Sequence, residues 1–309
     1  MIRIHAASAA PQNTHAGPEG ARPLIEITHL TKRYGNKTVL DGLSLTVQRG
    51  ETIVIIGGSG SGKSTLARAL VGLERPTSGQ ISIDGVDLTR LNDYALSDVR
   101  RRFAMVFQKH ALLDSMSIFD NIAFPLREET DLDEKTIHAK VMAQLKELGI
   151  EDAANKLPGE LSGGMAKRAG IARAMVIEPE ILVYDEPTSG LDPINSRIVD
   201  GLIEQMRERF LVTSIVITHD MATAFDVADR VALLAQGKIV AEGTPENIFS
   251  LDIAEIQAFA ASSAVDPARL GPRRPRKSSA EIRAQWEERR ARGELRRPAS
   301  PRPTNDPER

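Results

Sequence analysis

The chain has 309 residues, of which 41% are hydrophobic and 27% charged, so its composition is near the globular average and excludes disorder over the whole length. Its 40 basic and 42 acidic side chains leave a net charge of −2, which argues against a nucleic-acid-binding protein. The sequence has no cysteine, which excludes disulfides, cysteine-ligated zinc and a thiol nucleophile. No apolar run approaches the roughly 20 residues of a membrane-spanning helix and the N-terminus lacks a secretory signal, so we expect a soluble, cytoplasmic protein.

Composition divides the chain into three parts. Residues 1–22 are rich in Ala, Pro, Gly and His without periodicity, and we expect a disordered lead. Residues 264–309 hold 7 of the 17 prolines, and from residue 265 onward 13 basic side chains face 7 acidic ones, which predicts a basic, proline-rich tail. The remainder, 23–263, predicts one globular domain.

Strand patterns recur along the globular segment. Residues 25–28 and 43–47 alternate apolar and polar side chains, as half-buried strands do. Continuous apolar runs are typical of strands buried on both faces of a sheet. Such strands are expected at 52–56, 181–184 and 214–218.

Helical patterns alternate with these strands and predict an α/β fold. They cover 64–73, 134–148 and 165–177. From 111 to 160 they dominate without a convincing strand. We interpret about 109–165 as a helical subdomain inserted into the α/β domain.

A glycine-rich loop follows the strand at 52–56. Gly57–Ser64 satisfies the pattern G-x-x-x-x-G-K-S/T between a buried strand and a helix, which is the context that a phosphate-binding loop requires. Its glycines let successive backbone N–H groups converge on phosphate oxygens at a helix N-terminus. Lys63 is placed to reach β- and γ-phosphates, and the Ser64 hydroxyl to bind Mg²⁺. The predicted nucleotide-binding residues of this loop are Gly57, Gly58, Ser59, Gly60, Ser61, Gly62, Lys63, Ser64 and Thr65.

Two acidic residues follow the buried strand at 181–184. Such a strand delivers carboxylates at its C-terminal end, where open α/β sheets bind ligands. Asp185 is predicted to bind Mg²⁺ opposite Ser64, and Glu186 to polarise an attacking water. An Asp-Glu pair alone is more often a solvated turn, but the preceding apolar run and the phosphate loop favour the catalytic interpretation.

A second glycine pair opens the helix expected at 165–177. Leu161-Ser162-Gly163-Gly164-Met165 presents bare N–H groups and a serine hydroxyl at a helix N-terminus, which predicts a second anion site. This stretch resembles the signature motif of ATP-binding cassette (ABC) ATPases, and the similarity to that family covers about 23–250. The resemblance implies a P-loop NTPase of the ABC ATPase type with an N-terminal antiparallel β region. It also implies binding and hydrolysis of ATP with Mg²⁺.

The same resemblance assigns further residues. Gln108 matches the Q-loop glutamine, a catalytic and metal-binding position, and His219 matches the catalytic switch histidine. Tyr34 matches an aromatic that stacks on adenine, and Asp192 matches the D-loop aspartate. The family pairs two copies head to tail, so that Ser162, Gly163 and Gly164 of one copy bind the ATP held by the phosphate loop of the other.

One residue departs from the family pattern. The usual signature has glutamine after its two glycines, and Met165 cannot reproduce the hydrogen bonds of that amide. Contacts made through that side chain are therefore in doubt here, whereas those of Ser162 and the backbone are not.

Residues 112–128, together with the signature, resemble the ATPases of Mla-type phospholipid transport systems. Those systems maintain lipid asymmetry in the outer membrane. They combine a multi-spanning permease with an MCE-domain lipid-binding protein, and often with a STAS-domain subunit. The resemblance implies a peripheral protein on the cytoplasmic side of the inner membrane.

Two alternatives stay open. A glycine betaine/choline-type importer shares the Leu-Ser-Gly-Gly-Met signature, although it usually has glutamine where Lys167 stands and often carries regulatory domains larger than this tail. A non-transport ABC ATPase would act on DNA or ribosomes. The single phosphate loop and the lack of a heptad run argue against that class.

The tail contains one helical pattern. Ser278 and Glu281 form a capping box and Gly293 is a C-terminal stop, so we expect a helix over about 279–292. Ile282 and Trp286 share one of its faces. The helix is either solvated and partly frayed, or anchored through Trp286 on another surface, such as a second copy, a regulatory subunit or a lipid headgroup region.

Overall fold

The computed structural model describes residues 3–4, 22–107, 111–263, 273 and 276–295. Five parallel strands form the centre of the main sheet, and an antiparallel strand pair extends one edge of it. The order across this sheet is β1 (Arg3–Ile4), β11 (Lys238–Gly243), β10 (Arg230–Ala235), β4 (Thr52–Ile56), β9 (Thr213–Ile217), β8 (Ile181–Asp185) and β7 (Phe103–Val106). Arg3 and Ile4 form a strand, so the disorder predicted over 1–22 is wrong for these two residues. Residues 5–21 lie outside the described residues.

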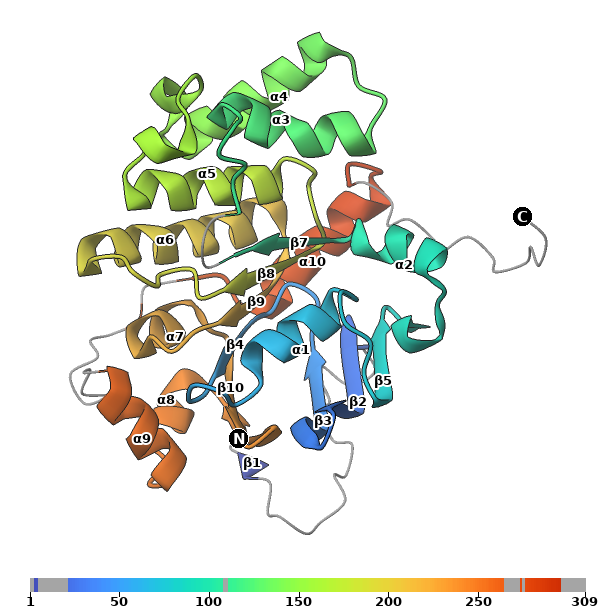
Figure 1. Cartoon of the computed structure of the whole chain (residues 1–309), viewed down its shortest axis with the longest axis vertical. Helices are drawn as coiled ribbons and strands as arrows, with labels where there is room; N and C mark the ends of the chain where they lie inside the picture. Colours follow the sequence, from blue (N-terminus) through green and yellow to red (C-terminus); the bar gives the residue numbers. More distant parts are fainter. Residues whose placement is uncertain (1–2, 5–21, 108–110, 264–272, 274–275, 296–309) are drawn as a thin grey trace.

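A smaller antiparallel sheet covers one face of the main sheet (Figure 1). Its order is β3 (Lys37–Val47), β2 (Ile25–Tyr34), β5 (Ser78–Ile83) and β6 (Val86–Asp87). The predicted α/β fold with an antiparallel N-terminal region is confirmed.

Helices cover both faces of the main sheet and extend beyond it (Figure 1). The α-helices are α1 (Lys63–Leu70), α2 (Asp93–Arg100), α3 (Ile118–Glu129), α4 (Glu134–Glu147), α5 (Gly163–Met175), α6 (Pro193–Phe210), α7 (Met221–Val227), α8 (Pro245–Phe249), α9 (Ala254–Ser263) and α10 (Ser279–Ala291). Short 3₁₀ turns occupy Leu88–Arg90, Glu151–Ala153 and Pro158–Glu160. Among the described helices, none combines the length and apolar composition that crossing a membrane requires.

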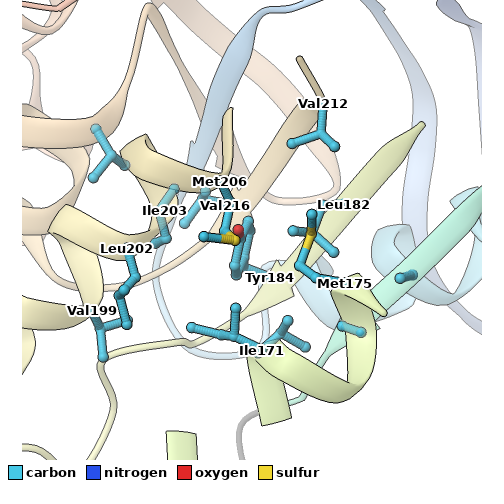
Figure 2. Packing of buried hydrophobic residues seen from close by; sticks show 14 of the residues in the cluster. Ile171, Met175, Leu182, Tyr184, Val199, Leu202, Ile203, Met206, Val212 and Val216 are labelled. Carbon is cyan, nitrogen blue, oxygen red and sulfur yellow. The ribbon is translucent and has the colours of Figure 1, made fainter. Parts of the chain in front are cut away.

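The central strand β4 separates two hydrophobic cores. Val54 and Ile56 point into the core formed with α3 to α7, whereas Ile53 and Ile55 point into the core formed with α1 and the smaller sheet. This alternation follows from the two-residue period of a strand. In the first core, Tyr184 lies among the side chains of Met175, Ile203, Met206 and Val216 (Figure 2). The phosphate loop therefore follows a strand that is packed against a hydrophobic core on both faces.

The helix expected in the tail is confirmed as α10, and its capping box is formed. Ser278 Oγ accepts a hydrogen bond from Glu281 N at 3.2 Å, and Ser278 N donates to Glu281 Oε2 at 2.7 Å. Ile282 and Trp286 are buried against Leu211. The expected solvated helix is wrong, and the expected anchoring through Trp286 is confirmed. The surface that receives it belongs to the same chain, where α10 crosses behind β8 and β9 (Figure 1), and not to a second copy, a regulatory subunit or a lipid headgroup region.

A buried arginine joins the tail to the core. Arg207 of α6 is fully buried, and its guanidinium donates to Gly50 O at 3.1 Å and to Lys277 O at 2.9 Å. It also pairs with Asp229 at 2.9 Å. Arg276 of the tail contacts the same Asp229 at 3.2 Å. We call these groups the Arg207 network.

Candidate functional site

The phosphate loop joins β4 to α1 at the carboxyl edge of the main sheet. Gly60 and Gly62 have φ values of +77° and +110°, a region that glycine adopts without strain. A Cβ at Gly57 would lie 2.2 Å from the Leu234 carbonyl oxygen, so the loop needs glycine to pass this close to β10. Gly62 offers no side chain to cap α1, and the first N–H groups of the helix can therefore bind phosphate oxygens.

Lys63 is folded along this loop. Its ammonium donates to Gly57 O at 2.7 Å and to Gly58 O at 3.0 Å. Burial lowers the pKa of Lys63, and the Glu186 and Asp185 carboxylates oppose that shift. The Lys63 ammonium group is thus held at the place where a phosphate group would enter the loop.

A pocket of about 1000 Å³ opens over the loop and collects most of the predicted groups. Gly57 to Thr65 line it, together with Glu186 and His219. The wall also includes residues that sequence patterns did not indicate, because no motif marks them: Lys37, Val39, Leu233, Leu234, Ala235, Gln236, Glu255, Ala258 and Phe259. The contribution of α9 to this wall depends on how the chain returns after β11, which no local pattern encodes.

Glu186 and His219 form a direct pair across the ends of β8 and β9. His219 Nδ1 lies 2.6 Å from Glu186 Oε2, and the backbone N of His219 donates to the same oxygen at 3.2 Å. Glu186 has a φ of +52°, a costly conformation for a residue with a side chain. Its backbone N is held by Ile217 O at 2.8 Å. The turn therefore aims the Glu186 carboxylate into the pocket, where it can accept a proton from water.

Asp185 is suited to bind a cation. Its Oδ1 is buried and makes no hydrogen bond within the described chain. Burial and the neighbouring Glu186 raise the pKa of Asp185, while Arg68, Lys63 and Lys167 oppose that shift. An orphaned carboxylate oxygen is the kind of ligand that Mg²⁺ prefers, and Ser64 would supply a second oxygen. Gln108, the third predicted metal ligand, lies outside the described residues.

The signature and the D-loop adjoin each other, away from this pocket. Ser162 caps α5 by accepting from Met165 N at 3.3 Å, and Asp192 caps α6. A Cβ on Gly164 would lie 2.6 Å from Asn195 Oδ1, so the first turns of α5 and α6 are in close contact. None of the three predicted residues Ser162, Gly163 and Gly164 is in the described wall of the pocket. The Met165 side chain packs against the core formed with α3 to α7, and this apolar environment suits a thioether better than an amide.

Tyr34 stands outside the pocket wall. Its hydroxyl hydrogen-bonds the Glu74 carboxylate, and its ring is 44% exposed. Lys32 Nζ lies 5.1 Å from the ring centroid. The structure therefore does not place Tyr34, the predicted adenine contact, among the residues described in the pocket wall.

A family model described as ABC transporter matches residues 40–189. The intermembrane phospholipid transport system ATP-binding protein MlaF of Haemophilus influenzae is 39% identical over 247 residues, which cover 80% of this chain and 94% of that protein. The chain belongs to the ABC transporter ATPase family. The methionine import ATP-binding protein MetN of Mesorhizobium japonicum is also 39% identical over 247 residues, covering 80% of this chain and 67% of that protein.

Solved structures agree with this assignment. The dimeric ATP-binding cassette MJ0796, in a post-hydrolysis state bound to ADP and Pi, superposes with a TM-score of 0.66. It is 30% identical and covers 72% of this chain and 98% of its own. The protein is therefore an ABC ATPase, an ATP-hydrolysing transporter subunit with the fold expected from its motifs.

Proposed function

We propose that this ABC ATPase energises phospholipid movement by a partner permease of the Mla type. The observation that carries the proposal is the extent of the match, since this chain aligns with 94% of the phospholipid-transport relative. The aligned part spans only 67% of the methionine-import relative at the same identity. The sequence of residues 112–128 favours the same choice.

We further propose that two copies pack head to tail around two ATP molecules. The phosphate loop and the signature bind phosphate by the same physics, yet the signature is absent from the described wall of the pocket over the phosphate loop. A second copy related by a two-fold axis would bring Ser162 and its glycines to the nucleotide on the phosphate loop. The dimeric cassette bound to ADP and Pi supports this arrangement.

In the proposed reaction, Glu186 accepts a proton from the water that attacks the γ-phosphate. His219 holds the Glu186 carboxylate through the 2.6 Å contact, and Lys63 neutralises charge on the phosphates. Asp185 and Ser64 would hold Mg²⁺, which neutralises charge on the β- and γ-phosphates when bound. ATP binding would close the dimer and hydrolysis would reopen it, which transmits motion to the permease.

The proposed location is the cytoplasmic side of the inner membrane, in peripheral association with a multi-spanning permease. An MCE-domain lipid-binding protein and a STAS-domain subunit complete the proposed complex. Support for these partners comes from the Mla-type resemblance and from the name of the phospholipid-transport relative.

Glu186→Gln tests the catalytic assignment. The amide cannot accept the proton, so turnover is expected to fall by about 10²–10⁴-fold while ATP binding is retained. Lys63→Ala is the matched comparison, since it should weaken nucleotide binding itself. ATP-dependent dimer formation by Glu186→Gln, followed by size-exclusion chromatography, completes the test. Hydrolysis at the wild-type rate would refute the role of Glu186.

Reconstitution tests the substrate. The ATPase is purified with its permease and placed in vesicles, where labelled phospholipid should move on addition of ATP. Glu186→Gln in the same complex is the control. ATP-driven uptake of glycine betaine or methionine, without lipid movement, would instead support a small-molecule importer.

A further inference from the structure

A second pocket lies where α10 packs on the core, at the opposite end of β4 from the phosphate loop. Its volume is about 480 Å³. Four arginines line it together with Trp286. Two come from the core and two from α10: Arg22, Arg49, Arg283 and Arg290. We call it the arginine–tryptophan pocket. Because α10 forms one wall, the pocket exists only when the tail is docked.

The pocket carries an excess of positive charge. Arg49 pairs with Glu180 and lies 3.7 Å from Asp84, and Arg283 pairs with Glu287 at 3.0 Å. Arg22 and Arg290 have no carboxylate partner among the described residues. Two carboxylates, Asp84 and Glu287, therefore share the wall with four guanidinium groups.

The Trp286 ring contacts two of these cations. The guanidinium carbon of Arg49 lies 3.7 Å from the ring centroid, and that of Arg290 lies 4.9 Å from it. The ring quadrupole attracts each cation, but the two cations repel one another. An anion in the pocket would attract both cations. Planar guanidinium groups match phosphate oxygens in geometry as well as in charge.

We propose that the arginine–tryptophan pocket is a binding site for a phosphate-bearing anion, distinct from the nucleotide site. The anion would contact Arg22 and Arg49 of the core and Arg290 of α10, and so would link the tail to the core. A soluble phosphate compound and a phospholipid headgroup share this chemistry. The site is independent of which substrate the transporter moves.

The protein provides its own probe, because Trp286 is the single tryptophan of the chain. The full-length protein is titrated at constant ionic strength with pyrophosphate, and separately with phosphatidylglycerol or phosphatidylcholine vesicles. The expected result is a saturable change in Trp286 fluorescence with pyrophosphate or with phosphatidylglycerol. Pyrophosphate alone would identify a soluble ligand, and phosphatidylglycerol alone would identify a headgroup.

Variants connect the response to the pocket. Arg290→Gln and Arg22→Gln should each weaken the response at least tenfold, because each removes a charged donor to the anion. Arg292→Gln is the matched control, since Arg292 is the C-terminal cap of the same helix, pairs with Glu288 and is not in the described wall. Basal ATP hydrolysis should be unchanged in all three.

Lys63→Ala distinguishes the arginine–tryptophan pocket from the nucleotide site. The Trp286 fluorescence response should persist in this variant. If neither probe produces a saturable change, or if Arg290→Gln and Arg22→Gln respond like the wild type, the site does not exist. Equal responses to phosphatidylglycerol and phosphatidylcholine without a response to pyrophosphate would also overturn it.

Discussion

Replacing Arg207 by methionine should destabilise the fold strongly, although this residue lies far from the phosphate loop. Methionine retains much of the side-chain volume but removes the hydrogen bonds to Gly50 O and Lys277 O. It also removes the 2.9 Å pair with Asp229. Burial already raises the pKa of Asp229, against the attraction of Arg276 and Arg207. The variant leaves this buried carboxylate with one cation fewer.

Removing one partner of a buried ion pair costs about 3–5 kcal/mol, because the remaining charge stays desolvated. For a domain of this size that corresponds to a fall in Tm of roughly 6–20 °C. Unfolding in urea and by heat, followed by circular dichroism, measures the loss. Arg197→Met is the control on the same helix, since Arg197 is 49% exposed and pairs with Asp226 at the surface, worth at most about 1 kcal/mol. Equal losses in both variants would refute the reasoning.

Three further outcomes follow from the described contacts. Tyr184→Phe should leave the free energy of unfolding unchanged or raise it by about 1 kcal/mol, because the Tyr184 hydroxyl is buried without a hydrogen-bond partner in the described chain; a loss above 1 kcal/mol in urea unfolding would contradict this. Gly164→Ala should push Asn195 away and lower ATP turnover by about 10–100-fold with ATP binding retained, as turnover and nucleotide titrations would show. Hydrogen bonds to Ser278 lower the pKa of Glu281, so the capping box is intact at neutral pH. Its contribution to stability is lost as the pH falls below 4.5, the ordinary pKa of a glutamate. A Trp286 emission that shifts only under acid conditions would bear this out.

The parallel strands and the phosphate loop could be predicted because their signals are local. The apolar run at 52–56 became β4 with the same bounds, and the acidic pair after 181–184 stands at the end of β8. Helix α6 had no such signal. Ser196, Asp200 and Arg207 are buried on its inner face, so its apolar period is interrupted.

Contacts distant in sequence account for what the patterns missed. The Ile282 and Trp286 stripe indicates that α10 has a face to bury, but not which surface receives it. Likewise the orientation of Tyr34 is decided by Glu74, forty residues along the chain. The wall contributed by Glu255 depends on the path of the chain after β11.

The Arg207 network also constrains the order in which the protein matures. Arg276 and Lys277 leave the ribosome after Gly50, Arg207 and Asp229. During synthesis the core can form its sheet, but its buried charges acquire their full set of partners only after residues 276 and 277 have emerged. Newly made protein should therefore pass through a stage in which the phosphate loop is assembled while this edge is still open to proteases and chaperones.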